Sequence, residues 1–455
     1  MELADKTIGI IGLGKRTGVV SAKVLTEIGA EIVISDVKSA EELEEEIGML
    51  EGISSIEYDL GGHTEKVLNV DMIVVSPGVP LEIPILKEAK ERGIEIISEI
   101  ELSYRLSKAP FIAITGTNGK TTTTSLTGKL LSSYPGQVFV GGNIGRTLIG
   151  EVTNLTEDDL VVAEVSSFQL ETIDEFHPEI AAFLNLTPDH LDRHKTLDAY
   201  LAAKMNIFKN QTENDYIILN ADDKTLVEIA DQIPSQIIWF SITDKKIPGV
   251  YLDDNKLICH LEEKQEIIGV DELKIRGDHN IENALASIAA AILKGIPISA
   301  TRQELKEFTS QEHTLEYVTT HQGVQFYNDS KGTNPDASVK ALTAFHEPVV
   351  LIAGGLSRGL DFTPFIEMIK SKVKDLVLIG ETKEELKECA EEAGFAGRID
   401  LVEDLEGAVK LGYQHSEKGD VVLFSPACAS WDMFESYAQR GRLFKEYVRD
   451  IVNSG

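Results

Sequence analysis

Short runs of apolar residues recur along the chain, separated by polar or glycine-rich turns and by segments with helical spacing. Runs rich in Val and Ile, with few charges, are typical of strands buried on both faces of a parallel sheet. Strands that alternate with helices in this way predict an α/β protein with parallel, doubly wound sheets. The clearest runs span residues 7–11, 31–35, 71–75, 95–98, 111–115, 138–140, 160–164, 180–186, 216–220, 237–241, 324–328, 349–353, 376–380 and 421–425.

The apolar run 111–115 is followed at once by a turn that has the parts of a phosphate-binding loop. A glycine turn with Lys and Thr between a strand and a helix favours an anion. In this interpretation the Lys120 amine reaches the β- and γ-phosphates, and the Thr121 hydroxyl takes a Mg²⁺ ion. Only two residues separate Gly116 from Gly119, where the general P-loop has four, so an ordinary strand–turn–helix is the alternative.

A second glycine turn lies near the N-terminus, where residues 12–18 read Gly-Leu-Gly-Lys-Arg-Thr-Gly between a predicted strand and a predicted helix at 19–28. This is close to a dinucleotide-binding fingerprint whose third glycine comes one residue late. An NAD site, a site for another nucleotide such as a UDP sugar, and a plain tight turn all stay open. Asp36 ends the next strand, where it could bind a ribose hydroxyl. Ser76-Pro77-Gly78-Val79 ends another strand and is a candidate second wall of the same pocket.

Several polar side chains in the middle of the chain have two interpretations each. Glu164 ends an apolar strand, where it either holds Mg²⁺ or faces solvent. Residues 187–194, Thr-Pro-Asp-His-Leu-Asp-Arg-His, could bind a metal, but the spacing fits no zinc motif and favours a polar loop. Lys204, inside a predicted helix at 197–210, taken alone indicates a surface lysine. Asn280 and Asn283 share one helix face and either contact a base or another domain, or cap the helix.

Composition excludes several classes of protein. The formal charge of −32 argues against nucleic acid or an anionic membrane as a general partner. No apolar run approaches the roughly 20 residues that span a bilayer, and residues 1–12 lack the pattern of a signal peptide. Cys259, Cys389 and Cys428 are far apart and match neither a zinc motif nor a disulfide framework. We therefore expect a cytoplasmic protein with local basic pockets for anionic substrates.

Several stretches together are far more specific than any one of them. TGTNGKTTT, EVSSFQL, NLTPDHLDRH, GDHNIENALA, YNDSKGTNP and SPACASWDMFESYAQRG occur in this order and span nearly the whole chain. In this combination the chain resembles the Mur ligase family, and SPACAS with the run through Gln439-Arg440-Gly441 resembles its D-glutamate-adding branch. The 455-residue length itself predicts about three domains. The resemblance implies an α/β protein with a Rossmann-like UDP-substrate domain at 1–107, a P-loop ATPase-like central domain with a parallel sheet at 108–311, and a Rossmann-like domain at 312–455 that binds the amino acid and part of ATP.

The resemblance implies an ATP-dependent ligase that adds D-glutamate to UDP-N-acetylmuramoyl-L-alanine in peptidoglycan precursor synthesis. ATP would phosphorylate the substrate carboxylate, and the amine of D-glutamate would displace the phosphate. Because a carboxylate is a poor electrophile, the phosphate supplies the leaving group, and catalysis is mostly positioning and charge neutralisation. The implied cofactors and partners are ATP, Mg²⁺, UDP-N-acetylmuramoyl-L-alanine and D-glutamate, with no nucleic acid, no membrane insertion and a monomeric state. The alternatives are a related ligase for another amino acid or acceptor, and a non-catalytic nucleotide-binding relative.

The same resemblance implies roles for individual residues. Lys204 matches a lysine that is carbamylated in the family, which would turn a cation into an oxygen ligand for a second Mg²⁺. Asn143 matches a residue near the reacting phosphate, and Thr121, Glu164 and His190 match metal positions. The implied ATP residues are Gly116, Thr117, Asn118, Gly119, Lys120, Thr121, Thr122, Asn280, Asn283, Asp329 and Lys331. The implied UDP-substrate residues are Gly14, Thr17, Asp36, Lys38, Ser76, Pro77 and Gly78, and the implied D-glutamate residues are Thr333, Arg358, Ser430 and Tyr437, with Lys331 near the same carboxylates or the γ-phosphate.

The chain departs from the family's pattern at the start of the third domain. His313-Thr314 stands where the family usually has His-Arg, and that arginine contacts the nucleotide. At the D-glutamate clamp, some members carry Lys where this chain has Arg358. An arginine offers a bidentate fork to a carboxylate, so this second change is compatible with the same function.

Overall fold

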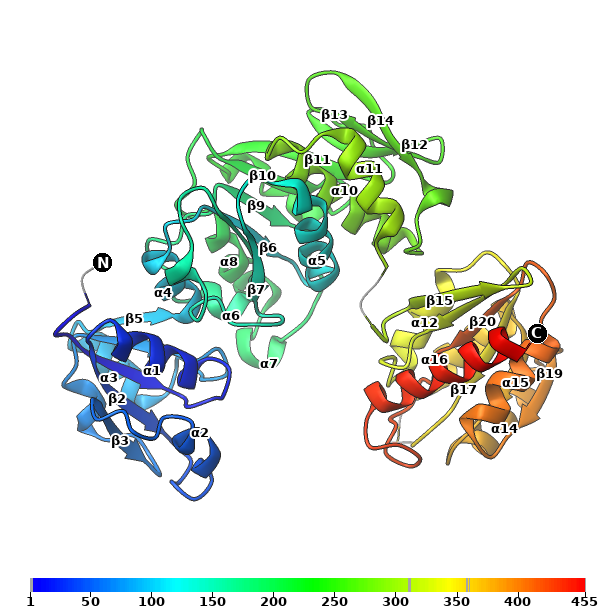
Figure 1. The fold of residues 1–455 in the computed structure, drawn as a ribbon, viewed down its shortest axis with the longest axis horizontal. Helices are drawn as coiled ribbons and strands as arrows, with labels where there is room; N and C mark the ends of the chain where they lie inside the picture. The colour runs from blue at the N-terminus through cyan, green and yellow to red at the C-terminus, as the bar shows by residue number, and fades with distance from the viewer. Residues whose placement is uncertain (1–2, 310–311, 357–358, 360, 455) are drawn as a thin grey trace. The chain divides into compact units, whose positions relative to one another are not determined.

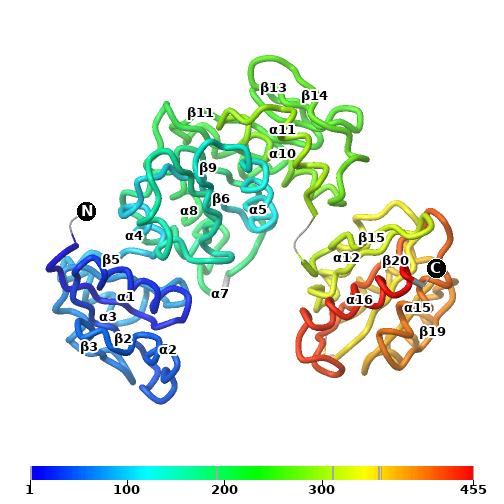
Figure 2. Tube along the Cα trace, in the orientation of Figure 1, coloured from blue at the N-terminus to red at the C-terminus, as the bar shows by residue number. Residues whose placement is uncertain are grey.

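The computed structural model describes residues 3–309, 312–356, 359 and 361–454. The chain forms two compact bodies, one of residues 1–270 and 282–305 and one of residues 271–281 and 306–455 (Figures 1 and 2). The first body contains a five-stranded and a nine-stranded sheet, and the second contains a six-stranded sheet. In Figure 2 most of the second body is the part of the trace from yellow-green to red, and its residues 271–281 lie in the green part.

The N-terminal sheet confirms the predicted Rossmann-like domain. Its strand order is β3-β2-β1-β4-β5, and every neighbouring pair is parallel. The first helix, α1, packs against β1 and β2, while α3 packs against β5. Ile11 at the end of β1 pairs with Val75 at the end of β4, so the turns that follow these strands lie at the same edge. The elements are β1 (Thr7–Ile11), α1 (Gly18–Glu27), β2 (Glu31–Asp36), α2 (Glu44–Gly48), β3 (Ile56–Leu60), the 3₁₀ turn η1 (Glu65–Leu68), β4 (Met72–Val75), α3 (Pro84–Glu91), β5 (Glu95–Ser98) and α4 (Glu99–Leu106).

The central sheet is parallel over most of its width and antiparallel at one end. Its order is β14-β13-β12-β11-β10-β9-β6-β8-β7, with parallel pairs from β7 through to β12. The last strands, β12, β13 and β14, form antiparallel pairs, so the predicted parallel sheet is confirmed only for the part that precedes them. The strands are β6 (Phe111–Thr115), β7 (Val138–Gly142), β8 (Leu160–Glu164), β9 (Ile180–Phe183), β10 (Tyr216–Asn220), β11 (Gln236–Ser241), β12 (Gly249–Asp253), β13 (Lys256–His260) and β14 (Lys264–Gly269).

Helices cover the faces of this sheet, with α5 against β6, β7 and β8, and α9 against β10. The strand predicted at 180–186 ends at Phe183, and the helix predicted at 197–210 ends at Met205, where a 3₁₀ turn follows. Both differences lie at the end of an element, where the regular structure often becomes irregular and a sequence pattern does not locate the boundary well. The helical elements are α5 (Lys120–Leu130), η2 (Leu131–Ser133), η3 (Val152–Asn154), α6 (Ser167–Leu170), α7 (Leu191–His194), α8 (Leu197–Met205), η4 (Asn206–Phe208), α9 (Lys224–Glu228), η5 (Ala230–Gln232), η6 (Val270–Glu272), α10 (Asp278–Leu293) and α11 (Ile298–Glu307).

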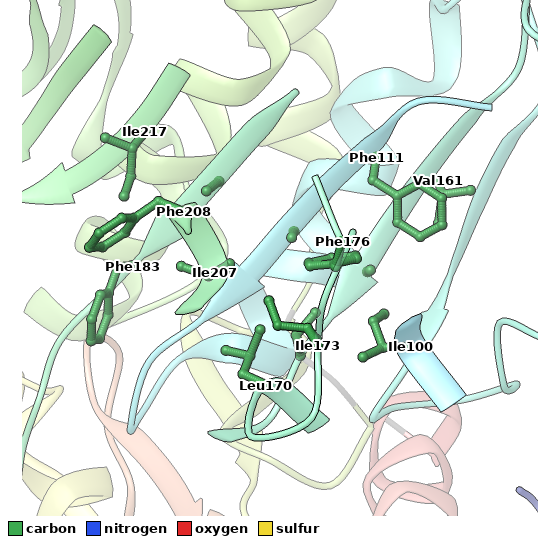
Figure 3. Packing of buried hydrophobic residues seen from close by; sticks show 14 of the residues in the cluster. Ile100, Phe111, Val161, Leu170, Ile173, Phe176, Phe183, Ile207, Phe208 and Ile217 are labelled. Atoms are coloured by element: carbon green, nitrogen blue, oxygen red, sulfur yellow. The ribbon is translucent and has the colours of Figure 1, made fainter. Parts of the chain in front are cut away.

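The core of the central domain holds the strand that carries the phosphate loop (Figure 3). Phe111, Tyr104 and Phe176 meet edge to face, with ring centroids 5.6–5.9 Å apart. This is a favourable geometry for aromatic pairs. Ile100, from α4, packs into the same cluster, whereas Leu102 packs into the core of the N-terminal domain. Because α4 contributes a side chain to each of the two cores, it fixes the N-terminal domain to the central domain within the first body.

The C-terminal sheet confirms the second Rossmann-like domain. Its order is β15-β16-β20-β17-β18-β19, parallel except for the β15–β16 hairpin. The long helix α16 packs against β15, β16 and α15 (Figure 1). The elements are β15 (Glu316–His321), β16 (Val324–Asn328), α12 (Pro335–Thr343), β17 (Val349–Ala353), α13 (Thr363–Lys372), β18 (Val373–Leu378), α14 (Lys383–Glu392), β19 (Arg398–Leu401), α15 (Leu405–His415), β20 (Val421–Phe424) and α16 (Tyr437–Ser454). The domain limits at 107/108 and 311/312 stay predictions, and no helix among the described residues is long and apolar enough to cross a membrane.

Candidate active site

The turn after β6 closes on itself through its own lysine. Gly116 and Gly119 have φ of 152° and 81°, a region that glycine enters without strain. A Cβ added to Gly119 would lie 2.2 Å from the Oδ1 of Asn283, so glycine is also required here for space. Lys120 begins α5, and its Nζ donates hydrogen bonds to the carbonyl oxygens of Gly116 and Thr117 at 2.9 and 2.8 Å. A glycine turn that leads into a helix N-terminus in this way suits a phosphate group.

The turn is also tied to the loop that follows β9. The backbone N–H of Asn118 donates to the Oδ1 of Asn185 at 2.8 Å, and the Thr117 hydroxyl donates to the carbonyl of Thr187 at 3.1 Å. Asn283, from α10, accepts a hydrogen bond from the Thr123 hydroxyl at 3.0 Å. The structure therefore places Asn283 against Gly119 of the turn and against Thr123 in the first turn of α5.

Lys204 is buried beside the same turn, and its interpretation as a surface lysine is wrong. The residue is 1% exposed, and its Nζ donates to the Gly116 carbonyl at 2.8 Å and to the Thr115 hydroxyl at 3.3 Å. The amine also lies 4.7 Å from the centre of the Tyr200 ring. Burial, and then the charge of Lys120, lower the pKa of Lys204 to about 7. A large share of this amine is therefore neutral, and hence nucleophilic, at neutral pH.

Glu164 and Asn143 form a buried polar pair at the ends of neighbouring strands. Glu164 ends β8, and the Nδ2 of Asn143, in the turn after β7, donates to its Oε1 at 2.7 Å. The other carboxylate oxygen, Oε2, is buried and has no hydrogen-bond partner among the residues that the structure describes. A buried carboxylate oxygen without a partner is costly. Divalent cations such as Mg²⁺ prefer oxygen ligands, so this oxygen fits a Mg²⁺ ligand.

His190 lies in a tight turn between β9 and α7. Its backbone N–H donates to the Oδ1 of Asp189 at 2.8 Å, and its φ of 51° is left-handed. The imidazole is half exposed and meets the rings of Phe168 and Tyr200 at centroid distances of 5.0 and 6.3 Å. His190 and Lys204 thus pack against the same ring of Tyr200. Within the described ranges, no three His, Cys, Asp or Glu side chains are close enough to hold a metal ion by themselves.

The predicted UDP-substrate residues all line one cavity of about 530 Å³. Asp36 fixes the wall of this cavity by accepting hydrogen bonds from the backbone N–H of Leu13 at 2.7 Å and of Lys38 at 3.0 Å. The Ser76 hydroxyl donates to the Gly12 carbonyl at 2.7 Å and joins the turns after β1 and β4. The predicted second wall is thus part of the same pocket. The lining includes Gly14, Thr17, Asp36, Lys38, Ser76, Pro77 and Gly78 from the N-terminal domain, and Asn143 from the central domain.

The predicted ribose and amino-acid residues lie on loops of the second body. Asp329, directly after β16, accepts hydrogen bonds from the Leu315 N–H at 3.0 Å and from the Ser425 hydroxyl at 2.6 Å, and burial raises its pKa to about 7. Lys331 and Thr333 follow on the same loop, and the buried Ser430 lies on the loop after β20.

The remaining predicted residues of the second body lie on other segments or outside the described ranges. Tyr437 begins α16 with 40% of its surface exposed. Asn280 donates to the Arg276 carbonyl at 2.8 Å. The Thr314 hydroxyl is buried without a hydrogen-bond partner among the described residues. Arg358, the predicted D-glutamate clamp, lies outside the described residues.

Sequence reasoning missed two arginines, one in each body, that hold loops carrying predicted site residues. Arg16, from the N-terminal glycine turn, donates to the carbonyls of Gly142 and Gly145 at 3.3 and 2.8 Å, on either side of Asn143. Arg440 is buried under the loops of the second body. Its place inside the C-terminal signature is the signal for it in the sequence, and burial of an arginine is uncommon enough that this signal alone does not predict it.

Family models match most of the chain. The MurD-like N-terminal domain of Mur ligases matches residues 6–98, the Mur ligase middle domain matches 114–291, and the glutamate ligase domain of Mur ligases matches 315–428. The chain belongs to the Mur ligase family.

Relatives with a curated name narrow the comparison within that family. UDP-N-acetylmuramoylalanine–D-glutamate ligase of Clostridioides difficile (strain 630) is 45% identical over 452 residues, which cover 99% of this chain and 100% of that protein. The enzyme of the same name from Alkaliphilus metalliredigens (strain QYMF) is 45% identical over 458 residues, with full coverage of both chains.

Solved structures show the same fold at low sequence identity. UDP-N-acetylmuramate–alanine ligase MurC from Thermotoga maritima has a TM-score of 0.56 at 19% identity, covering 98% of this chain and 100% of that one. UDP-N-acetylmuramoyl-L-alanyl-D-glutamate–2,6-diaminopimelate ligase has a TM-score of 0.60 at 18% identity, covering 85% of this chain and 93% of that one.

Proposed function

We propose that this protein is an ATP-dependent ligase that joins D-glutamate to UDP-N-acetylmuramoyl-L-alanine in peptidoglycan precursor synthesis. One observation carries the proposal. A phosphate-type turn, a buried carboxylate with an unpaired oxygen and a lysine of low pKa lie together around Gly116. They do so in a chain that is 45% identical, along its whole length, to enzymes of that name. We also propose that it acts as a cytoplasmic monomer. Because its product would be a peptidoglycan precursor, the reaction would serve cell-wall growth, cell shape and division.

The residues of the first body suit the phosphorylation of a carboxylate. Gly116, Thr117, Asn118, Gly119 and Thr122 would surround the ATP phosphates, and Lys120 would exchange its contacts with the turn for the β- and γ-phosphates. The Thr121 hydroxyl, the free oxygen of Glu164 and the His190 imidazole would hold Mg²⁺, which supplies charge neutralisation for the transferred phosphoryl group. Asn143 would orient Glu164 through the bond to its Oε1. Asn283 would contact the adenine side, as would Asn280.

Lys204 suits carbamylation because its amine is partly neutral and protected from water. The neutral amine would attack the carbon of CO₂ and form a new N–C bond, while one C=O π bond opens and leaves its electron pair on oxygen. The nitrogen would then lose a proton to solvent. The resulting carbamate carries a negative charge on oxygen and is a suitable ligand for a second Mg²⁺. It would also replace the repulsion between two lysine ammonium groups by an attraction between Lys120 and an anion.

The other substrates would use the remaining predicted residues. The cavity that includes Asp36, Lys38 and the Ser76 turn would take the UDP moiety of the acceptor. Lys331, Thr333, Arg358, Ser430 and Tyr437 would bind the carboxylates of D-glutamate or the γ-phosphate, and Asp329 would contact the ribose. The D-glutamate amine would then attack the acyl phosphate, forming the amide bond and releasing inorganic phosphate.

Phosphate release tests the whole proposal. The protein is given ATP, Mg²⁺ and UDP-N-acetylmuramoyl-L-alanine with D-glutamate, L-glutamate, D-aspartate, L-lysine or no amino acid. Release that needs both the UDP substrate and D-glutamate is the expected result. Release with another amino acid would keep the ligase chemistry and change its specificity. No release from folded protein that still binds ATP would favour a non-catalytic relative, for which Thr314 is the one supporting residue.

A further inference from the structure

Arg440 is a buried arginine that the proposed chemistry does not use. It lies in the first turns of α16 and is 1% exposed. Its Nη2 donates hydrogen bonds to the carbonyl oxygens of Ser330 at 2.9 Å and Cys428 at 3.0 Å, and its Nη1 donates to that of Ala429 at 3.2 Å. No carboxylate lies within ion-pair distance of it in the part of the chain that the structure describes. Burial of a guanidinium without an ion pair is unfavourable in free energy. Its three hydrogen bonds are therefore expected to have a structural or functional role.

The three carbonyls belong to two different loops. Ser330 is on the loop that follows β16, and Cys428 and Ala429 are on the loop that follows β20. β16 and β20 are parallel neighbours, with Asn328 paired to Phe424, so both loops leave the same edge of the sheet. The first loop carries Lys331 and Thr333, and the second carries Ser430. The guanidinium therefore bridges the segments that carry Thr333 and Ser430, two of the predicted D-glutamate residues.

The packing around this bridge leaves little freedom. A Cβ on Gly355 would lie 3.2 Å from the Arg440 Nη1 and 2.4 Å from the Ala429 carbonyl oxygen. A Cβ on Gly441 would lie 2.3 Å from the Ser330 hydroxyl. Ala427 in the second loop has a φ of 59°, a strained conformation for alanine that its surroundings must hold. The Ala429 carbonyl also accepts from the Leu356 N–H at 3.0 Å, which ties in the loop after β17.

The chemistry of the bridge is specific to arginine. A guanidinium presents several N–H donors in a rigid plane and can serve carbonyls of separate loops at once. A lysine ammonium is a compact point charge on a flexible stem, and a glutamine has fewer donors on a shorter side chain. Substitution of Arg440 should thus free one loop from the other even where the fold is kept.

We propose that Arg440 is a positioning residue that fixes the loops at 329–334 and 426–430 to each other, so that Lys331, Thr333 and Ser430 present one preformed surface to the carboxylates of D-glutamate. The inference rests on the proposed function for the identity of that ligand. The link between the loops does not depend on it. Preformed sites bind more tightly because their loops are already ordered before the ligand arrives, so binding carries no free-energy cost for ordering them.

The kinetic test compares Arg440→Lys and Arg440→Gln with Arg449→Gln, an exposed arginine on the same helix. We expect the KM for D-glutamate to rise about tenfold or more in both Arg440 variants, since each loses at least one charge-assisted hydrogen bond. The KM values for ATP and the UDP substrate should stay within about twofold, and Arg449→Gln should match the wild type. An Arg440→Ala variant should regain part of its D-glutamate affinity with millimolar guanidinium. Unchanged KM for D-glutamate in folded Arg440 variants would overturn the proposal.

Hydrogen exchange gives a readout that needs no activity. In Arg440→Gln, amides at 329–334 and 427–430 should lose protection together, while those of β17 and β18 keep theirs. Loss in only one loop, or in neither, would overturn the bridge. If amides exchange throughout Arg440→Gln because this variant fails to fold, the same comparison of loop and strand protection is made with Arg440→Lys. If the wild type ignores D-glutamate but the loops still loosen together, the proposed function fails while the bridge stands.

Discussion

Lys120 and Lys204 donate hydrogen bonds to the same carbonyl oxygen, that of Gly116, at 2.9 and 2.8 Å. Two ammonium groups that share one acceptor repel each other, and both are largely removed from water. Burial lowers the pKa of both amines, and the charge of Lys120 lowers that of Lys204 further, to about 7. Without substrates, the site thus holds one lysine that is ready to bind phosphate and one that is ready to lose its proton.

The low pKa of Lys204 sets the pH dependence of its carbamylation. Only the neutral amine attacks CO₂, so below pH 7 the rate at a fixed CO₂ concentration should rise about tenfold per pH unit and level off above about pH 8. The signal to follow is the carbamate carbon in ¹³C NMR after addition of ¹³CO₂. It should be absent in Lys204→Arg. A rate that keeps rising to pH 10, as for an ordinary lysine, would contradict the assignment.

Loss of the Lys204 side chain should be repairable by a small anion. Lys204→Ala is expected to be inactive in phosphate release, because the oxygen ligand for the second Mg²⁺ is gone. Acetate or formate should restore part of the activity by entering the vacated space. Lys209→Ala, at an exposed position a few residues on, is the matched control and should behave as wild type in both conditions. Full activity of Lys204→Ala without any additive would remove the carbamate from the mechanism.

Lys120→Ala should abolish turnover while the protein stays folded. The Lys120 amine is the group of the turn that can neutralise the transferred phosphate, and loss of such a group costs on the order of 1000-fold or more. Steady-state phosphate release gives the rate, and circular dichroism with a thermal melt reports the fold. Lys129→Ala removes an exposed lysine from the same helix and should retain activity. Wild-type-like turnover by Lys120→Ala would rule out the phosphate-loop assignment.

The sequence could predict the strands and turns that are determined by residues close together along the chain. The run from Phe111 to Thr115 became β6 at those residues, and the glycine turn after it adopts the left-handed backbone that Gly116 and Gly119 allow. The tight turn between β12 and β13 is equally local, but it was not predicted from the sequence. Asp254 and Asn255 both take positive φ, at 47° and 61°, which is the signature of a tight hairpin, and they join the first antiparallel pair of this sheet.

Burial of single polar residues could not be predicted in the same way. Lys204 lies in a helix whose local pattern does not separate an inward from an outward lysine, and only its neighbours from β6 and the phosphate turn bury it. Arg440 is similar, because its three partners are 11, 12 and 110 residues away along the chain. Such contacts depend on the packed fold rather than on spacing, so a resemblance could point to Lys204 while Arg440 needed the structure.

Thr314→Arg should strengthen ATP binding if the departure from the family's His-Arg pair weakens it. The present Thr314 hydroxyl is buried and has no hydrogen-bond partner in the described ranges, so its replacement forfeits no such bond. A guanidinium that reaches the nucleotide would lower the KM for ATP several-fold, at about 1.4 kcal/mol per tenfold change. Thr314→Gln, which adds length without charge, is the control. Equal KM values for ATP in all three proteins would show that position 314 does not reach the nucleotide.

The buried carboxylate of Glu101 should dominate the stability of the junction between the N-terminal and central domains. It is fully buried in α4, accepts backbone N–H bonds from Asp174, Glu175 and Phe176 at 2.9 Å each, and accepts the Arg105 Nε at 2.6 Å. Glu101→Gln keeps the shape but removes the buried carboxylate that pairs with the Arg105 Nε, while Glu95 still pairs with the Nη2. The free energy of unfolding of this body should therefore fall by about 1–3 kcal/mol. Urea denaturation with exchange of the 174–176 amides measures it.

Glu95→Gln provides the matched comparison, since Glu95 pairs with the same arginine at 2.7 Å but keeps 41% of its side chain exposed. An exposed partner is worth about 1 kcal/mol or less, because water and salt screen it. The ratio between the variants is therefore the informative quantity, as both remove one carboxylate from Arg105. Equal losses would mean that the carboxylate matters only as a charge near Arg105, and that the three backbone bonds it accepts contribute nothing to the stability of the junction.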